Sequence, residues 1–94
     1  MSSYKIFPRQ QENAKKLKLV IKSSTNPLKK IDVFQNGKKV ASIGAIKYKD
    51  YATYIEDKGI DFANKRKKLY KARHQKTRNI INTPSYFADK ILWS

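Results

Sequence analysis

The sequence of 94 residues contains no cysteine, a single histidine and only three glycines. The absence of thiols excludes disulfide bonds, thiolate catalysis and the common zinc clusters. His74 has no second imidazole with which to share a metal ion, and three scattered glycines cannot build a phosphate-binding loop. We therefore expect a protein that is not an enzyme, holds no metal or cofactor and takes no small-molecule substrate.

Long apolar runs are also missing. The opening stretch, MSSYKIFPRQ, does not resemble a signal peptide, and no segment reaches the ~18–20 apolar residues of a membrane-spanning helix. The expectation is a soluble chain made in the cytosol. A chain of this length forms one domain that buries roughly 60–65% of its unfolded surface, so its core is small.

Acidic residues are scarce, at 7 Asp and Glu against 22 Lys and Arg, for a net charge of +15. The basic residues are 18 Lys and 4 Arg, which favours sequence-independent attraction over base reading. Such charge attracts nucleic-acid phosphate, anionic headgroups or an acidic protein surface. Codon bias is an open alternative, because Lys, Ile and Asn make up 34 of the 94 residues and all have A/T-rich codons.

Two regions are expected. Residues 1–16 are polar and basic and are predicted to form an extended N-terminal arm that is ordered only against a partner. Its apolar residues, the predicted arm contacts, are Tyr4, Ile6 and Phe7. Residues 17–94 are predicted to form a single small domain of the α+β class.

Alternating apolar residues predict strands over 17–24 and on both sides of Asn36-Gly37. Asn-Gly favours a type I′ hairpin, because both residues tolerate positive φ. An unbroken register from that turn places Val33 opposite Val40. Apolar residues then occur on both faces, so we expect one face to pack on the chain's own helices and the other on a partner.

Helices are predicted over 47–59, over 62–75 with Asp61 as the cap, and from Thr83-Pro84 to the end. The fold expected is thus a small antiparallel sheet of two to three strands backed by two to three short helices. Leu69 and Tyr70 are expected in the core. The Arg73 and His74 side chains are expected to point back into the fold and donate hydrogen bonds to backbone carbonyls.

No acid occurs between Phe62 and Ala88, although bases are dense there. This predicts contacts with a polyanion or an acidic partner, while a merely solvated helix face is the alternative reading. The predicted contact residues are Lys65, Arg66, Lys67, Lys68, Lys71, Lys76 and Arg78.

Several short motifs follow one another in order: a turn at 36–39 (Asn-Gly-Lys-Lys), the pair Tyr48 and Tyr51, the run YKARH at 70–74, and a closing Leu92-Trp93. Over roughly residues 29–93 this order resembles short basic proteins of nucleocytoplasmic large (giant) DNA viruses. The chain departs from that pattern in a longer segment after Tyr51 and in one residue after Trp93. The structural motif that the resemblance marks is Tyr70, Arg73, His74 and Trp93.

The resemblance implies a viral protein located in the virion, assembled in the host cytoplasm, with no catalytic residues. The first hypothesis is a minor capsid protein that cements major and minor capsid proteins on the inner side of the shell. Its charge would then meet acidic capsid faces or anionic headgroups of an inner membrane. The alternative is a sequence-nonspecific DNA-binding virion protein that condenses or packages the genome.

Overall fold

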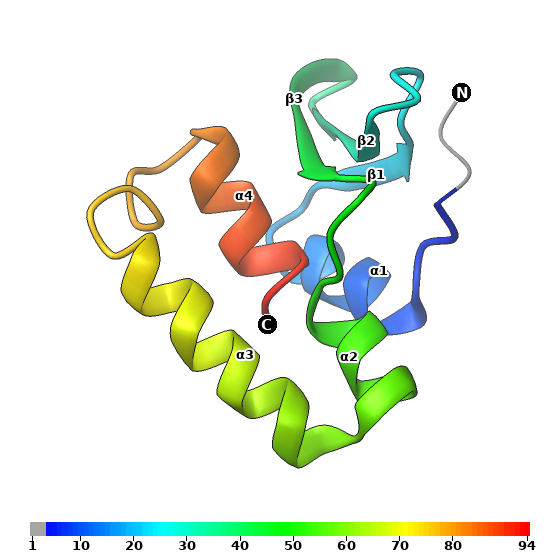
Figure 1. Ribbon diagram of the computed structural model, residues 1–94. Coiled ribbons are helices and arrows are strands. Elements are labelled where there is room, and N and C mark those ends of the chain that lie inside the picture. The colour runs from blue at the N-terminus through cyan, green and yellow to red at the C-terminus, as the bar shows by residue number, and fades with distance from the viewer. Residues whose placement is uncertain (1–3) are drawn as a thin grey trace.

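Residues 4–94, which a computed structural model describes, form an antiparallel sheet and four helices (Figure 1). The α+β class and the three-stranded sheet are confirmed, although the described chain has one helix more than the two to three expected. The sheet has the order β1-β2-β3. The elements are α1 (Pro8–Lys16), β1 (Val20–Ser23), β2 (Lys29–Gln35), β3 (Lys38–Ala45), α2 (Tyr51–Lys58), α3 (Ile60–Arg73) and α4 (Pro84–Ile91).

The β2–β3 turn has the predicted conformation, with φ of 53° at Asn36 and 78° at Gly37. Beyond the turn, however, the predicted register is wrong. A bulge between Val33 and Phe34 makes Val33 pair with Ala41 rather than with Val40. One extra residue reverses which face every following side chain occupies. Val40 is therefore exposed, and Ile43 lies buried opposite Ile31.

One face of the sheet carries the core. Ile31, Val33 and Ile43 are each at most 2% exposed, and α4 packs against β3 to cover them. Helix α4 begins as predicted, because the Thr83 hydroxyl accepts a hydrogen bond from the backbone N–H of Tyr86 at 3.2 Å. The apolar end of the chain thus packs on its own sheet. The buried side chains that it contributes are Phe87, Ile91, Leu92 and Trp93.

The opposite face is partly polar and also carries the apolar pair Val20 and Phe34, so apolar groups do occur on both sides. Alternation along β2 places Lys30, Asp32 and Phe34 on this face. The Asp32 carboxylate is buried and accepts hydrogen bonds from the Ser24 and Ser42 hydroxyls at 2.6 and 2.7 Å. Internal hydrogen bonds therefore satisfy the buried carboxylate on this face.

An extended N-terminal arm is not found in the described residues. Pro8–Lys16 forms α1, which packs against α4 and β1. Its end is fixed by Lys18, whose φ of 59° turns the chain so that the Leu19 N–H bonds the Ala14 carbonyl at 2.9 Å. This reversal also explains why β1 begins at Val20, three residues later than predicted.

The α2–α3 pair begins at other residues than predicted, whereas α2 ends at Gly59 as expected. Asp50 begins α2 by accepting from the Thr53 N–H at 3.0 Å, and Gly59, at φ 92°, ends α2 and begins α3. Asp61 therefore lies in the first turn of α3 rather than at its cap. Only Ala63 and Tyr70 of α3 are buried, whereas Leu69, expected in the core, is 57% exposed.

Asp32 should control the acid stability of the sheet. Burial raises the pKa of this carboxyl, but hydrogen bonds from Ser24, Ser42 and Thr25 outweigh burial and lower it from 3.8 to about 2. A lowered pKa stabilises the fold above pH 3.8, and that contribution is lost as the pH falls towards about 2. Asp32→Asn should reduce the free energy of unfolding by about 2 kcal/mol at neutral pH.

Urea unfolding at neutral pH and down to about pH 2 measures both effects. Asp32→Asn should also flatten the loss of stability over this range. Glu56→Gln, at an exposed position, serves as the matched control and should change neither quantity. Equal stability and equal acid dependence for Asp32→Asn and the parent chain would contradict this role.

Candidate functional site

Helix α3 carries three of the seven predicted contact residues as exposed side chains. Lys65, Arg66 and Lys68 are exposed on the helix, and Lys76 is exposed just beyond its end. Helix α3 packs against α2 and contacts the rest of the domain through a few side chains (Figure 1). These four cations are positioned to meet a large anion.

The other three predicted contact residues are used within the fold. Lys67 lies 4.6 Å from the centre of the Tyr51 ring, and burial, followed by Lys71 and Arg9, lowers its pKa. Lys71 and Arg78 both turn to Asp89, with N–O distances of 2.9 and 3.8 Å. The predicted set of seven is therefore divided into four exposed side chains and three half-buried ones that have partners within the fold.

Asp89 is the first acid after the acid-free run 62–88, and it pairs with cations of that run. Its side chain is fully buried on α4 and also pairs with Lys90 at 3.3 Å. Because Lys71 comes from α3 and Asp89 from α4, this pair ties the basic helix to the body of the protein. A buried carboxylate is tolerated only where cations compensate it, and here several do so.

A stack of rings also holds α3. Tyr70 lies almost parallel to Trp93, with centroids 4.5 Å apart and planes 9° apart. On its other side, Tyr70 stacks on His74 at 4.3 Å. Burial and the nearby Asp89 raise the pKa of the Tyr70 phenol to about 12, so it stays neutral at physiological pH. The motif residues Tyr70, His74 and Trp93 therefore come together.

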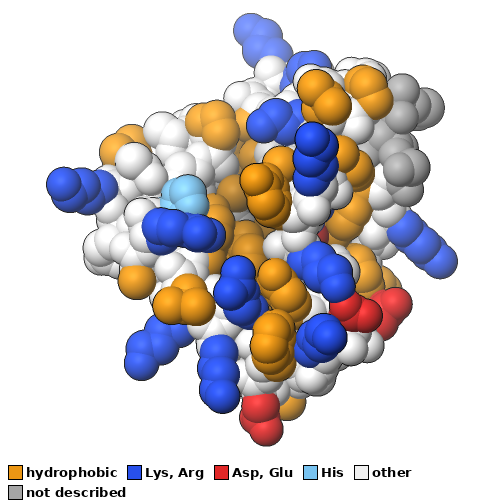
Figure 2. Space-filling model, viewed as in Figure 1, with side chains coloured by type: hydrophobic (Ala, Val, Ile, Leu, Met, Phe, Trp, Pro, Cys, Tyr) orange, Lys and Arg blue, Asp and Glu red, His pale blue; other side chains and the backbone are white. Residues whose placement is uncertain are grey.

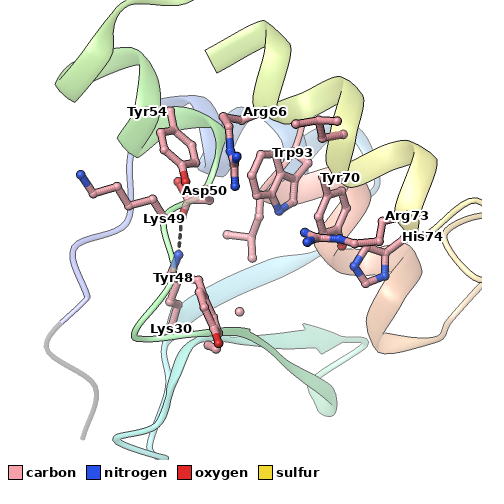
Figure 3. Close-up of a pocket in the computed structure, with 14 residues that line it drawn as sticks. Lys30, Tyr48, Lys49, Asp50, Tyr54, Arg66, Tyr70, Arg73, His74 and Trp93 are labelled. Atoms are coloured by element: carbon pink, nitrogen blue, oxygen red, sulfur yellow. Dashed lines mark hydrogen bonds and ion pairs between the residues drawn. The ribbon is translucent and has the colours of Figure 1, made fainter. Parts of the chain in front are cut away.

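Arg73 is placed differently from the expectation. Its side chain is exposed, and within residues 4–94 its guanidinium has no hydrogen-bonding partner. It does not reach back to backbone carbonyls. Figure 3 shows it beside Tyr70 and His74, at the edge of a cavity. Unlike His74, it is therefore available to a ligand.

That cavity is a cleft of about 820 Å³ between α3 and the sheet. Arg66, Leu69 and Arg73 line it from α3, while Tyr48 and Lys49 line it from the segment that joins β3 to α2 (Figure 3). Its remaining lining residues are Lys30, Gly44, Ala45, Asp50, Tyr54, Tyr70, His74, Leu92 and Trp93. The cleft is thus bounded by cations and aromatic rings.

A close packing contact forms part of the sheet-side wall. Gly44, at φ 76°, lies inside β3 where an added Cβ would come within 2.9 Å of both the Leu92 Cδ1 and the Lys30 Cδ atoms. Only a glycine lets these side chains pass so near the strand. Lys30 can therefore run along the wall to reach Asp50.

Lys30 and Asp50 form a buried ion pair at 3.0 Å, with side chains 4% and 1% exposed. Asp50 also accepts from the Tyr4 hydroxyl at 2.6 Å, and Tyr4 in turn accepts from Gln10 at 2.7 Å. Burial, together with the Asp50 charge, raises the pKa of Tyr4. The network joins the N-terminal segment, β2 and α2 behind the cleft.

Tyr4, Ile6 and Phe7, the predicted arm contacts, lie in or beside this hydrogen-bond network. Tyr4 and Ile6 pack partly buried against the core, and Phe7 is half-buried where α1 begins, its N–H donating to Gln10 at 2.8 Å. These three side chains therefore contact their own domain. They are not free for a neighbouring protein in this conformation.

The cleft and its surroundings are strongly positive. Of its lining residues, all of which lie in the described chain, Asp50 is the one acid, and its charge is balanced by Lys30. On the face seen in Figure 2, Lys and Arg side chains surround hydrophobic ones, and few Asp or Glu are visible. Anions would be attracted here, and flat apolar groups could be accommodated.

Other kinds of site were sought in the described part of the chain. Residues 4–94 hold no group of three His, Asp or Glu side chains placed to bind a metal ion. None of the helices there combines the length and apolar character that crossing a bilayer requires. Comparisons with protein-family models, curated proteins and solved structures found no match.

Sequence reasoning missed Lys30, Tyr48, Asp50 and Asp89. Asp50 gave a signal, since an Asp three residues before Thr53 is typical of a helix start. Asp89 gave a weaker one, as an acid amid the apolar positions of α4. Tyr48 was assigned to a helix, whereas it lies before α2 and is 74% exposed.

The stack of Tyr70 on Trp93 should be required to keep α3 packed against the rest of the domain. Tyr70→Ala should lower the free energy of unfolding by about 3 kcal/mol, because a large buried ring and its contact with Trp93 are lost. Trp93 is the one tryptophan of the chain, so its fluorescence should shift to longer wavelength as water reaches it. Tyr70→Phe keeps the ring and should change neither observable. An unshifted emission in Tyr70→Ala would refute the role of the stack.

Proposed function

We propose that this chain is a non-catalytic, basic protein that binds nucleic acid without regard to sequence. The observation that supports it most is the row of exposed cations on and just after α3, Lys65, Arg66, Lys68 and Lys76. Lysine charges held on a helix neutralise phosphates and release counterions, which drives binding of this type. With the viral resemblance, the proposal becomes a virion protein that condenses or packages a DNA genome.

The internal use of acids strengthens this proposal. Four carboxylates, those of Asp32, Asp50, Asp57 and Asp89, form ion pairs with lysine or arginine within the fold. Three of these are almost completely buried, so they present no carboxylate at the surface to repel an approaching phosphate. The remaining surface charge is then mostly positive and uncompensated.

A minor capsid role is a second proposal, and a different observation favours it. Ile80 and Ile81, in the segment between α3 and α4, are 52% and 70% exposed. Adjacent exposed isoleucines are typical of a surface that a neighbouring protein covers. In this proposal the occupant is a capsid protein, or the headgroup region of an inner membrane, and the contact is made by this segment. Tyr4, Ile6 and Phe7 would not make it, because they pack on their own domain.

Duplex DNA binding tests the first proposal. Replacing Lys65, Arg66, Lys68 and Lys76 by Gln should weaken binding at least about a hundredfold at low salt and reduce the salt slope by about 0.9 for each lost phosphate contact. Fluorescence anisotropy with a labelled duplex over a series of salt concentrations measures both quantities.

A variant with four other exposed lysines replaced is the matched control. Lys15, Lys16, Lys18 and Lys22 lie on α1, β1 and the turn between them, and their change to Gln removes the same net charge. This control should retain most of the salt slope. If both variants lose affinity and slope equally, net charge rather than α3 determines binding, and the proposed interface is wrong.

A further inference from the structure

The cleft beside α3 has features that binding to a phosphate backbone does not require. Tyr48 is 74% exposed at its mouth, so most of its ring is open to a stacking partner. Leu69, 57% exposed, lines the cleft from α3. Figure 3 places Tyr48 on the sheet side and Arg66, Tyr70 and Arg73 on the α3 side, so a flat group could enter between the two walls.

The size of the cleft limits what can enter. A volume of about 820 Å³ lies in the range of sites that hold a molecule of nucleotide size. The bases of a duplex are paired and stacked, so they cannot enter a cleft in the protein without being unpaired. An unpaired base of a single strand exposes both faces and can do so.

The charged groups around the mouth fit the rest of a nucleotide. Arg66 lies 5.6 Å from the Tyr54 ring centre, and Arg73 is exposed with no internal hydrogen-bonding partner among residues 4–94. Planar guanidinium groups bind phosphate through paired hydrogen bonds, and two of the four arginines of the chain line this one cleft. From there, Lys65, Lys68 and Lys76 continue the positive surface along α3, where further phosphates of a strand could lie.

We infer that the cleft binds an unpaired nucleobase of single-stranded nucleic acid, stacked on Tyr48 against Leu69, with its flanking phosphates on Arg66 and Arg73. The inference rests on the proposed nucleic-acid binding and adds the class of ligand to it. Stacking on a ring works for every base, so this site also has no strong sequence preference. The chain then binds single strands at the cleft and duplex only through charge.

Three labelled probes separate stacking from charge: an oligo(dT) of about 12 nucleotides, an abasic strand of the same length, and a duplex. The parent chain should bind oligo(dT) about tenfold more tightly than the abasic strand, since only the former has bases to stack. Tyr48→Ala should remove that preference and leave duplex affinity within about twofold. Tyr48→Phe, which keeps the ring, should retain the preference.

Each outcome decides the question. Equal affinity of the parent chain for oligo(dT) and the abasic strand, or a preference that survives Tyr48→Ala, overturns the inference. If the inference fails in this way but duplex binding still weakens with salt, the proposed sequence-independent binding of nucleic acid is retained. If none of the probes binds in a salt-dependent way, the proposed function itself fails. Trp93 emission, which an exposed Tyr48 should not influence, verifies that the variants are folded.

Discussion

The stacking of Tyr70 on Trp93 is the contact on which the arrangement of this molecule depends. Helix α3 buries only Ala63 and Tyr70, and six of its 14 residues are lysine or arginine. Such a helix gains little from packing, and its like charges repel one another. A parallel ring contact with the chain's closing tryptophan, next to the ion pair of Lys71 with Asp89, holds it beside the sheet. These contacts fix the wall of the cleft that α3 forms.

The distribution of the acids follows from the same constraint. With only seven acids against 22 bases, those that exist are placed where they organise structure. Asp50 begins α2 and neutralises Lys30, Asp32 joins three segments around the sheet, and Asp89 binds α3 to α4. Buried carboxylates are stable here because hydroxyls, backbone N–H groups or ammonium groups surround each one. The exterior is left basic, and in our proposal that excess charge is neutralised by nucleic acid.

Features set by neighbouring residues could be predicted from the sequence, and those set by distant contacts could not. The Asn36-Gly37 turn and the Thr83 cap depend on local chemistry and were predicted correctly. The bulge after Val33 depends on how the whole sheet twists and packs, so the register beyond the turn was wrong. The basic run was recognised as a charged surface, but only the fold shows that Lys71 and Arg78 turn inward to Asp89. Charge counts locate the candidate site, whereas the cleft arises from segments far apart in the chain.

The account's central claim is that one surface, formed by α3 and the segment around Tyr48, binds nucleic acid. Amide chemical shifts of the isotope-labelled protein, followed by NMR during titration with a single-stranded oligonucleotide, test this residue by residue. Shift changes should concentrate at 47–49 and 65–76 and should be absent around Lys15, Lys16 and Lys22, which are also basic and exposed. Changes spread evenly over all lysine-bearing surfaces, or centred on α1 and β1, would contradict it.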